Sequence, residues 1–310
     1  MIFLAVFLIW ATAVPSPDQW EQEWQLRESG SAALAARNHR KCKDSFLQLA
    51  RMESSRPITD ALNAAICSAL LGETPGAIEH LQLALSRGFR EPDRLEQEDA
   101  FRSLRSDLRW NTLTAWAVAN KAAYLKQINQ ELYEIYQKDQ AARRGPPSPD
   151  MKQEDAQRLR RVQEILKRGG ARHSEDYLHA AFIFQHGDDV NSARRAHQLA
   201  LQSVKLDETN GMAKWIAAAA KDRELVRRKL PQKYGTQFNC ANKVCKLEPW
   251  DPSTTDSERA RWNVPPLKIS QMRAENMTRG MSAPPPAPPP PPTPASAPIA
   301  DSPTRALSPR

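Results

Sequence analysis

Small residues recur at fixed spacings in residues 60–89, and this pattern constrains the fold more than any other feature of the chain. Ala65, Gly72, Ala77 and Ala84 are separated by seven, five and seven residues. Small side chains at these separations allow two antiparallel helices to approach closely, and a glycine permits the tight connection between them. The segment is therefore predicted to form a helical hairpin.

Residues 174–210 repeat this arrangement less regularly. Ala180 and Gly187 are seven residues apart, as are Ala193 and Ala200. Both segments resemble the tetratricopeptide repeat, which implies stacked helical hairpins with a concave binding surface. Glycine is scarce, at 11 residues, and strong helix formers are frequent, which favours helices over sheets. The predicted fold is all-α, with antiparallel helical hairpins in two packed modules, because two repeats do not support a long solenoid.

Breaks in the helical pattern predict how the chain is divided. We expect an N-terminal helical module over residues 19–117 and a second helical domain over residues 118–269, which ends in a loop-rich extension. Residues 270–310 are expected to be a disordered or polyproline II tail, because ten prolines fall between Pro284 and Pro298. Two interpretations of the tail remain open, a spacer and a docking ligand for a proline-binding partner.

The N-terminus has the form of a secretory signal peptide over residues 1–13. Residues 2–10 are all apolar, and Ala11-Thr12-Ala13 follows as a cleavage site. No Lys or Arg precedes the apolar run, so a buried first helix is the alternative. The signal predicts an exported protein, periplasmic or secreted, and no later segment is apolar enough to cross a membrane.

The four cysteines fit an exported protein. Cys240 and Cys245 flank a predicted turn and are expected to close a small disulfide loop. Cys42 and Cys67 fall on consecutive predicted helices at similar distances from Pro57, so they could also be bridged. Free thiols are the alternative for both pairs. Neither a metal site nor a cofactor is predicted, because no second Cys or His pair has suitable spacing.

The net charge of +8 comes largely from two basic stretches. Residues 143–172 hold nine Lys or Arg against four acids, and residues 221–233 hold six against two. The basic residues alternate with Gln and Glu and lack an aromatic stacking pattern. This favours solvated helix surfaces over a nucleic-acid interface, with attraction to an anionic envelope surface as an intermediate interpretation.

Polar residues that helix packing does not require form a series of motifs in the second domain. In order they are Asp139-Gln140 with Arg143, Gln185-His186, Asp222-Arg223 and Pro231-Gln-Lys-Tyr-Gly-Thr-Gln237. With residues 264–267, Val-Pro-Pro-Leu, they resemble an uncharacterised bacterial family of unknown function. The likeness covers about residues 128–269. It implies a compact helical domain and no particular activity.

Eight of these residues are candidate ligand-binding residues: Gln185, His186, Asp222, Arg223, Gln232, Tyr234, Thr236 and Gln237. His186 could act as a base oriented by Asp222, Arg223 could hold an anion, and the loop could close over a ligand. Alternatively, the same side chains satisfy the backbone of an irregular loop and fix its packing, which the sequence favours. Asp139 and Arg143 alone are expected to be an ordinary surface pair. His173 and His179 are weaker candidates.

The leading functional prediction is an exported helical-repeat scaffold that binds a protein or peptide partner in the cell envelope. The alternative is a small-ligand-binding protein or enzyme that uses the polar motifs. The sequence contains no Ser-His-Asp arrangement, phosphate loop or His-Glu-x-x-His motif, so no reaction is predicted.

Overall fold

The computed structural model describes residues 16–52, 54–143 and 148–282. The predicted signal peptide, residues 1–13, lies outside the described residues. The proline-rich segment beyond residue 282 also lies outside them. The predictions for these two segments therefore remain predictions.

The N-terminal part consists of helices with short connections. They are α1 (Pro17–Ala35), α2 (His39–Arg51), α3 (Pro57–Leu70), α4 (Thr74–Ser86), α5 (Pro92–Gln97), a 3-10 helix η1 (Asp99–Ser106) and α6 (Trp110–Gln127). A proline stands in the first turn of α1, α3, α4 and α5. Proline suits this position because the first helical N–H groups have no partner within the helix.

The C-terminal part contains further helices and one β-hairpin. The elements are α7 (Gln130–Ala142), α8 (Met151–Lys167), α9 (Ser174–Gln185), α10 (Val190–Leu206), α11 (Gly211–Arg227), β1 (Phe238–Ala241), β2 (Val244–Leu247), α12 (Asp256–Arg261) and α13 (Leu267–Ser282). β1 and β2 pair antiparallel and form the only sheet within the described residues. The predicted helical fold is confirmed.

The small residues of the first predicted hairpin lie where α3 packs against α4. Ala65, Ala77 and Ala84 are completely buried in the N-terminal core. Gly72 connects the two helices with φ of 75°, a conformation that L side chains rarely adopt. The assignment of this hairpin to the tetratricopeptide type remains a prediction.

Helix α6 links the two parts of the chain. Its first half contributes Trp110, Leu113 and Ala117 to the core formed by α3, α4, α5 and η1. Near its other end, the Tyr124 hydroxyl donates a hydrogen bond to Glu175 of α9. The predicted boundary between residues 117 and 118 thus lies inside one continuous helix, at the point where it passes from one core to the next.

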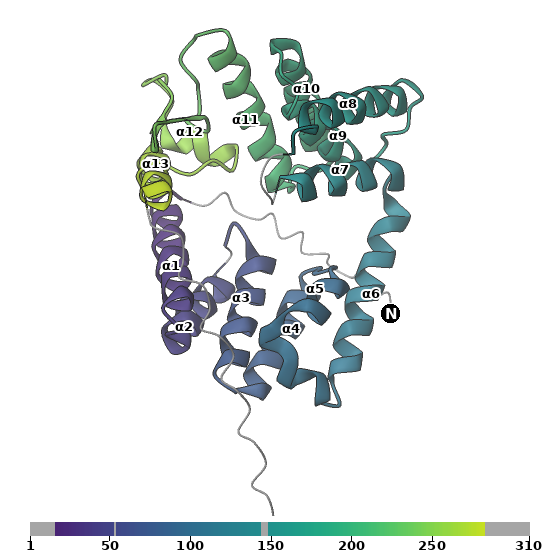
Figure 1. The fold of residues 1–310 in the computed structure, drawn as a ribbon, viewed down its shortest axis with the longest axis vertical. Coiled ribbons are helices and arrows are strands. Elements are labelled where there is room, and N and C mark those ends of the chain that lie inside the picture. Colours follow the sequence, from purple (N-terminus) through teal and green to yellow (C-terminus); the bar gives the residue numbers. More distant parts are fainter. Residues whose placement is uncertain (1–15, 53, 144–147, 283–310) are drawn as a thin grey trace, which may run out of the picture.

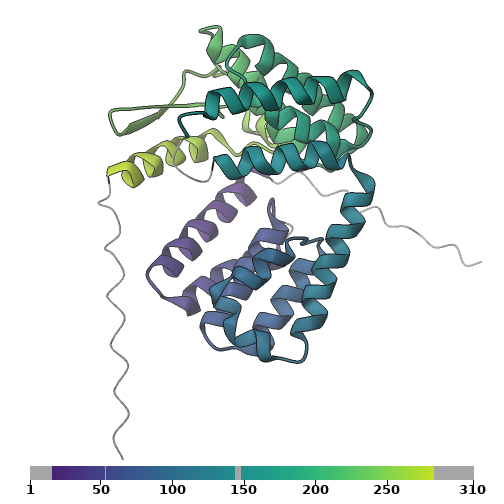
Figure 2. The same cartoon turned by 45° about the vertical axis from the view of Figure 1, so that its right-hand side comes forward.

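The helices form an arch whose two ends meet, so that α13 lies against α1 (Figures 1 and 2). Lys268 donates to Glu21 at 2.8 Å, and Asn276 donates to Glu28 at 2.8 Å. These contacts join residues almost 250 positions apart in the sequence. They place the first and last described helices side by side.

The prediction that the disordered tail begins at residue 270 is wrong. Residues 270–282 belong to helix α13. The helix buries Ile269, Ser270 and Ala274. The Thr278 hydroxyl accepts a hydrogen bond from the Cys245 N–H of β2 at 2.8 Å. Contacts with β2 and α1, both distant in sequence, order a segment whose own composition gives only a weak helical signal.

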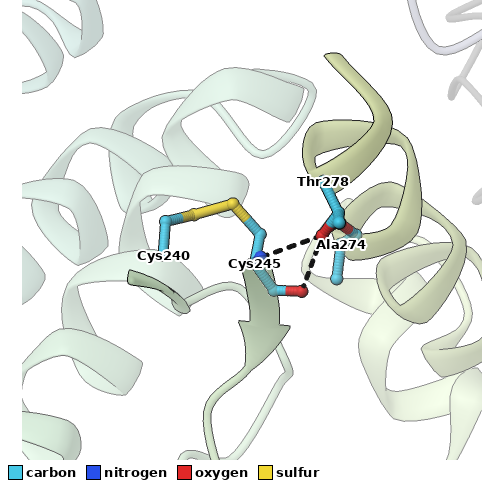
Figure 3. Close-up of a disulfide and its surroundings, with 4 residues drawn as sticks. All are labelled: Cys240, Cys245, Ala274 and Thr278. Atoms are coloured by element: carbon cyan, nitrogen blue, oxygen red, sulfur yellow. Dashed lines mark hydrogen bonds between the residues drawn. A yellow bond between two sulfur atoms is a disulfide. The ribbon is translucent and has the colours of Figure 1, made fainter. Parts of the chain in front are cut away.

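Both cysteine pairs are joined as disulfides in the structure. Cys42 of α2 and Cys67 of α3 are bridged within the N-terminal core. Cys240 and Cys245 stand opposite each other on β1 and β2, and Thr278 of α13 bonds the Cys245 backbone (Figure 3). The second disulfide therefore stiffens the hairpin on which α13 packs.

Removing the Cys42–Cys67 disulfide is expected to lower the free energy of unfolding by about 3 kcal/mol, because it closes a loop of 25 residues in the unfolded chain. The Cys240–Cys245 disulfide closes only five and should contribute about 2 kcal/mol. Denaturant unfolding of the two double Cys→Ala variants measures this difference. Equal stability of the first variant and the wild type would contradict it.

Candidate functional site

The loop that follows α11 is held by one buried carboxylate. Asp222 is fully buried and accepts four hydrogen bonds. The donors are the backbone N–H groups of Lys233, Tyr234 and Thr236 and the Thr236 hydroxyl, at 2.7 to 3.0 Å. Burial raises the pKa of Asp222, whereas these donors favour its ionised form. Asp222 thus fixes the loop on α11.

Two glutamines complete this attachment. Gln232 donates to the backbone oxygens of Gln237 and Glu248 and accepts from the Gln237 N–H. The Gln237 side chain donates to the Ala219 oxygen of α11 and accepts from Arg223 at 3.1 Å. Both amide side chains are therefore engaged within the fold.

The loop turns at Tyr234 and Gly235, where one side chain is buried and the next residue is a glycine. The Tyr234 ring is buried against Ala218, Val264 and Trp262. Gly235 has φ of 82°, and a Cβ at this position would lie 3.3 Å from Leu267. A left-handed, closely packed turn of this kind requires glycine.

Arg223 ties α11 to α9 through two neutral acceptors and has no carboxylate partner within the described residues. Its guanidinium donates to the Gln185 backbone oxygen and to the Gln237 side chain. Burial lowers the pKa of Arg223 to about 10, assisted by the positive charges of Arg227 and Arg143. The motif residues on α9, α11 and the loop therefore bond to one another.

His186 belongs to a different cluster. Its Nδ1 atom lies 3.0 Å from the carboxylate of Asp139, which is buried and also pairs with Arg143 at 2.7 Å. The Arg143 guanidinium also donates to both carboxylate oxygens of Asp155, each at 2.9 Å. The predicted orientation of His186 by Asp222 is wrong, because Asp222 is occupied by the loop. Asp139 and Arg143 are likewise not a surface pair.

His179 lies in a cluster of tyrosines between α6, α7 and α9. The Tyr136 ring stacks on it at 4.7 Å, and the Tyr124 hydroxyl lies 3.1 Å from its Nε2 atom. Burial is the main reason that the pKa of His179 is lowered to about 4. The negative charge of Asp176 opposes this shift, and the positive charge of Arg90 supports it. The imidazole is therefore neutral at physiological pH.

The neutral state of His179 predicts a pH dependence of stability. As the pH falls from about 6.5 to 4, the unfolded chain takes up a proton that the native imidazole does not, so the native state is destabilised. The expected loss is about 3 kcal/mol. Subtracting the pH profile of a His179→Phe variant isolates this contribution, because other groups titrate in both proteins. Parallel profiles would contradict the prediction.

An open groove of about 790 Å³ lies where α1, α11 and α13 meet beside β1. Four large apolar side chains line it, together with two arginines: Trp24, Trp215, Phe238, Met277, Arg273 and Arg279. Of the eight candidate residues, only Thr236 reaches it. The groove has the size and the largely apolar lining of a ligand-binding site.

A smaller and more enclosed cavity of about 200 Å³ adjoins the groove. The two share Trp24, Glu28 and Arg273. Trp20 and Arg27 of α1, Arg56 before α3 and Ile269 of α13 line the remainder. The cavity is therefore completed where the two ends of the arch meet.

No protein-family model, curated protein or solved structure matches the chain. The resemblance to an uncharacterised bacterial family therefore stays a prediction. Within residues 16–282, apart from the undescribed positions, no helix is long and apolar enough to cross a membrane. The same residues contain no cluster of His, Cys, Asp or Glu that could hold a metal ion.

Apart from Thr236, the residues of the groove and the cavity were not identified from the sequence. Many of them come from α1, whose sequence shows only a helical pattern, and from α13, most of which was assigned to the tail. Tryptophans at positions 20 and 24, one helical turn apart, were the available signal. This signal does not indicate that Arg273, about 250 residues away, would lie beside them.

Proposed function

We propose that the chain is a non-catalytic helical scaffold that binds a peptide segment of a partner protein in the groove between α1, α11 and α13. The groove itself carries this proposal, because its aromatic and methionine side chains offer pockets for apolar residues of a ligand. Arg273 and Arg279 add positive charge along one side. Its volume exceeds what a single side chain needs.

Export to an oxidising compartment is part of the proposal. The pairing of all four cysteines supports it, because structural disulfides are rare in reducing cytosol. The alternative of an enzyme or small-ligand site built on the polar motifs has less support. Asp222, Arg223, Gln232, Thr236 and Gln237 bond within the fold, and His186 lies beside Asp139, away from Asp222. The Gln185 side-chain oxygen is buried and has no hydrogen-bond partner among the described residues.

A peptide array probed with the purified, oxidised chain tests the proposal. Met277→Glu places a charge in the groove and is expected to abolish binding to the peptides that the wild type retains. Met212→Glu is the matched control, because Met212 is also exposed but lies outside the groove. Failure of the wild type to bind any peptide, or equal loss in both variants, would contradict the proposal.

A further inference from the structure

The enclosed cavity beside the groove has an unusual set of charges. Arg27, Arg56 and Arg273 all line it, and Asp60 and Glu28 are the acidic side chains on its wall. Positive groups gathered in an enclosed space repel one another unless carboxylates or an anionic ligand offset them. The pairing of each arginine therefore decides what the cavity can bind.

Arg27 is fully engaged within the protein. It lies 3.0 Å from the carboxylate of Glu23 and bonds both oxygens of Asp60, at 3.1 and 2.8 Å. Both carboxylates are buried and also accept from Ser54 and Ser55. Arg27, Glu23 and Asp60 form a closed ionic group that positions the wall of the cavity.

Arg56 and Arg273 have no such partners. Neither guanidinium makes an ion pair or a hydrogen bond with any side chain or carbonyl of the described residues. Burial and the positive charges of Arg56 and Arg27 together lower the pKa of Arg273 to about 10, although the negative charge of Glu28 acts in the opposite direction. The Arg273 guanidinium carbon lies 5.5 Å from the centre of the Trp24 ring, which holds the side chain beside the groove.

Trp20 supplies an independent observation in the same cavity. Only 8% of its surface is exposed, and its indole N–H meets no acceptor among the described residues. Buried donors are normally satisfied, so this N–H is a buried hydrogen-bonding group for which the described residues supply no acceptor. Two guanidinium groups without an ion pair therefore line a cavity whose own carboxylates already have partners, since Asp60 bonds Arg27 and Glu28 accepts from Asn276.

We infer that this cavity binds the C-terminal carboxylate of the peptide whose side chains occupy the adjoining groove. A carboxylate has two oxygens that match the planar fork of a guanidinium and can also accept from an indole N–H. The cavity is small and enclosed, so it suits the end of a chain better than an internal segment, which would have to leave again. The inference rests on the proposed function and specifies the ligand end that is recognised.

Matched peptides with free and amidated C-termini test this inference. The probes are N-terminally fluorescein-labelled peptides selected on the array, each prepared in both forms, and fluorescence anisotropy with the oxidised full chain gives their affinities. We expect amidation to weaken binding at least tenfold, because it removes the charge and one acceptor oxygen. Amidated peptides that keep an internal Glu distinguish a side-chain carboxylate from the terminal one.

Arg56→Gln and Arg273→Gln identify the groups that hold the carboxylate. Each substitution is expected to weaken binding of the free-acid peptide about tenfold and to leave binding of the amidated peptide unchanged. Arg94→Gln, at an exposed position of α5, should change the affinity for neither peptide. The denaturant midpoints should change little, because neither guanidinium forms an ion pair within the described residues and Arg273→Gln loses only the contact with Trp24. Equal binding of acid and amide would overturn the inference and leave the proposed function standing. Absence of binding by both forms would remove the proposed function itself.

Discussion

Replacing Arg27 by Gln is expected to lower the free energy of unfolding by about 4 kcal/mol, because it leaves two buried carboxylates without their cation. Glu23 and Asp60 are buried completely or nearly so, and Arg27 is their only positive partner within 4 Å in the described residues. Burial lowers the pKa of Arg27, but its bonds to Asp60 and Glu23 outweigh this and raise it overall. The ionic group therefore stabilises the folded state only while all three members are present.

Arg102→Gln is the control for this effect. Arg102 also forms an ion pair, with Asp99, but both side chains are more than 70% exposed. Exposed pairs contribute about 1 kcal/mol or less, so the control should be nearly neutral in denaturant unfolding. Similar losses in the two variants would mean that the Arg27 group is solvated and does not hold α1 against α3.

Replacing Asp222 by Ala should also cost about 4 kcal/mol, because four donors lose their acceptor in a buried position. The affected groups are the N–H groups of Lys233, Tyr234 and Thr236 and the Thr236 hydroxyl. Without the carboxylate, the loop that carries the most specific sequence motif keeps only the contacts of Gln237 and Tyr234 with α11. Free energies from denaturant unfolding measure the loss.

Asp188→Ala is the matched control, since Asp188 is an exposed aspartate whose contact with Lys152 is at the surface. Its expected effect is below about 1 kcal/mol. A stable Asp222→Ala variant would show that the motif is not required for folding. The residues around Asp222 would then become the leading candidates for ligand binding.

Local signals in the sequence were sufficient for most of the helices. Proline in the first turn and glycine at the ends, as at Gly72 and Gly88, act within a few residues of the chain. The burial of Ala65, Ala77 and Ala84 follows from the same short spacing. The cysteine pairs are also local, since Cys240 and Cys245 need only a hairpin between them.

Long-range pairing could not be predicted from these signals. His186 was assigned to Asp222 because both look functional, but α7 brings Asp139 to within 3.0 Å of it. Helix α13 owes its order to β2 and α1, which no short window contains. The groove depends on the closure of the arch, so the arginines and tryptophans that line it carry no common pattern in the sequence.

Hydrogen exchange of the full chain with and without a bound peptide tests most directly where binding occurs. We predict that the peptide slows exchange in residues 17–35, 236–238 and 267–280, which border the groove and the cavity. The region around His186 and Asp139 should exchange at the same rate in both samples. Protection confined to α7, α8 and α9 would contradict a binding site between the ends of the arch.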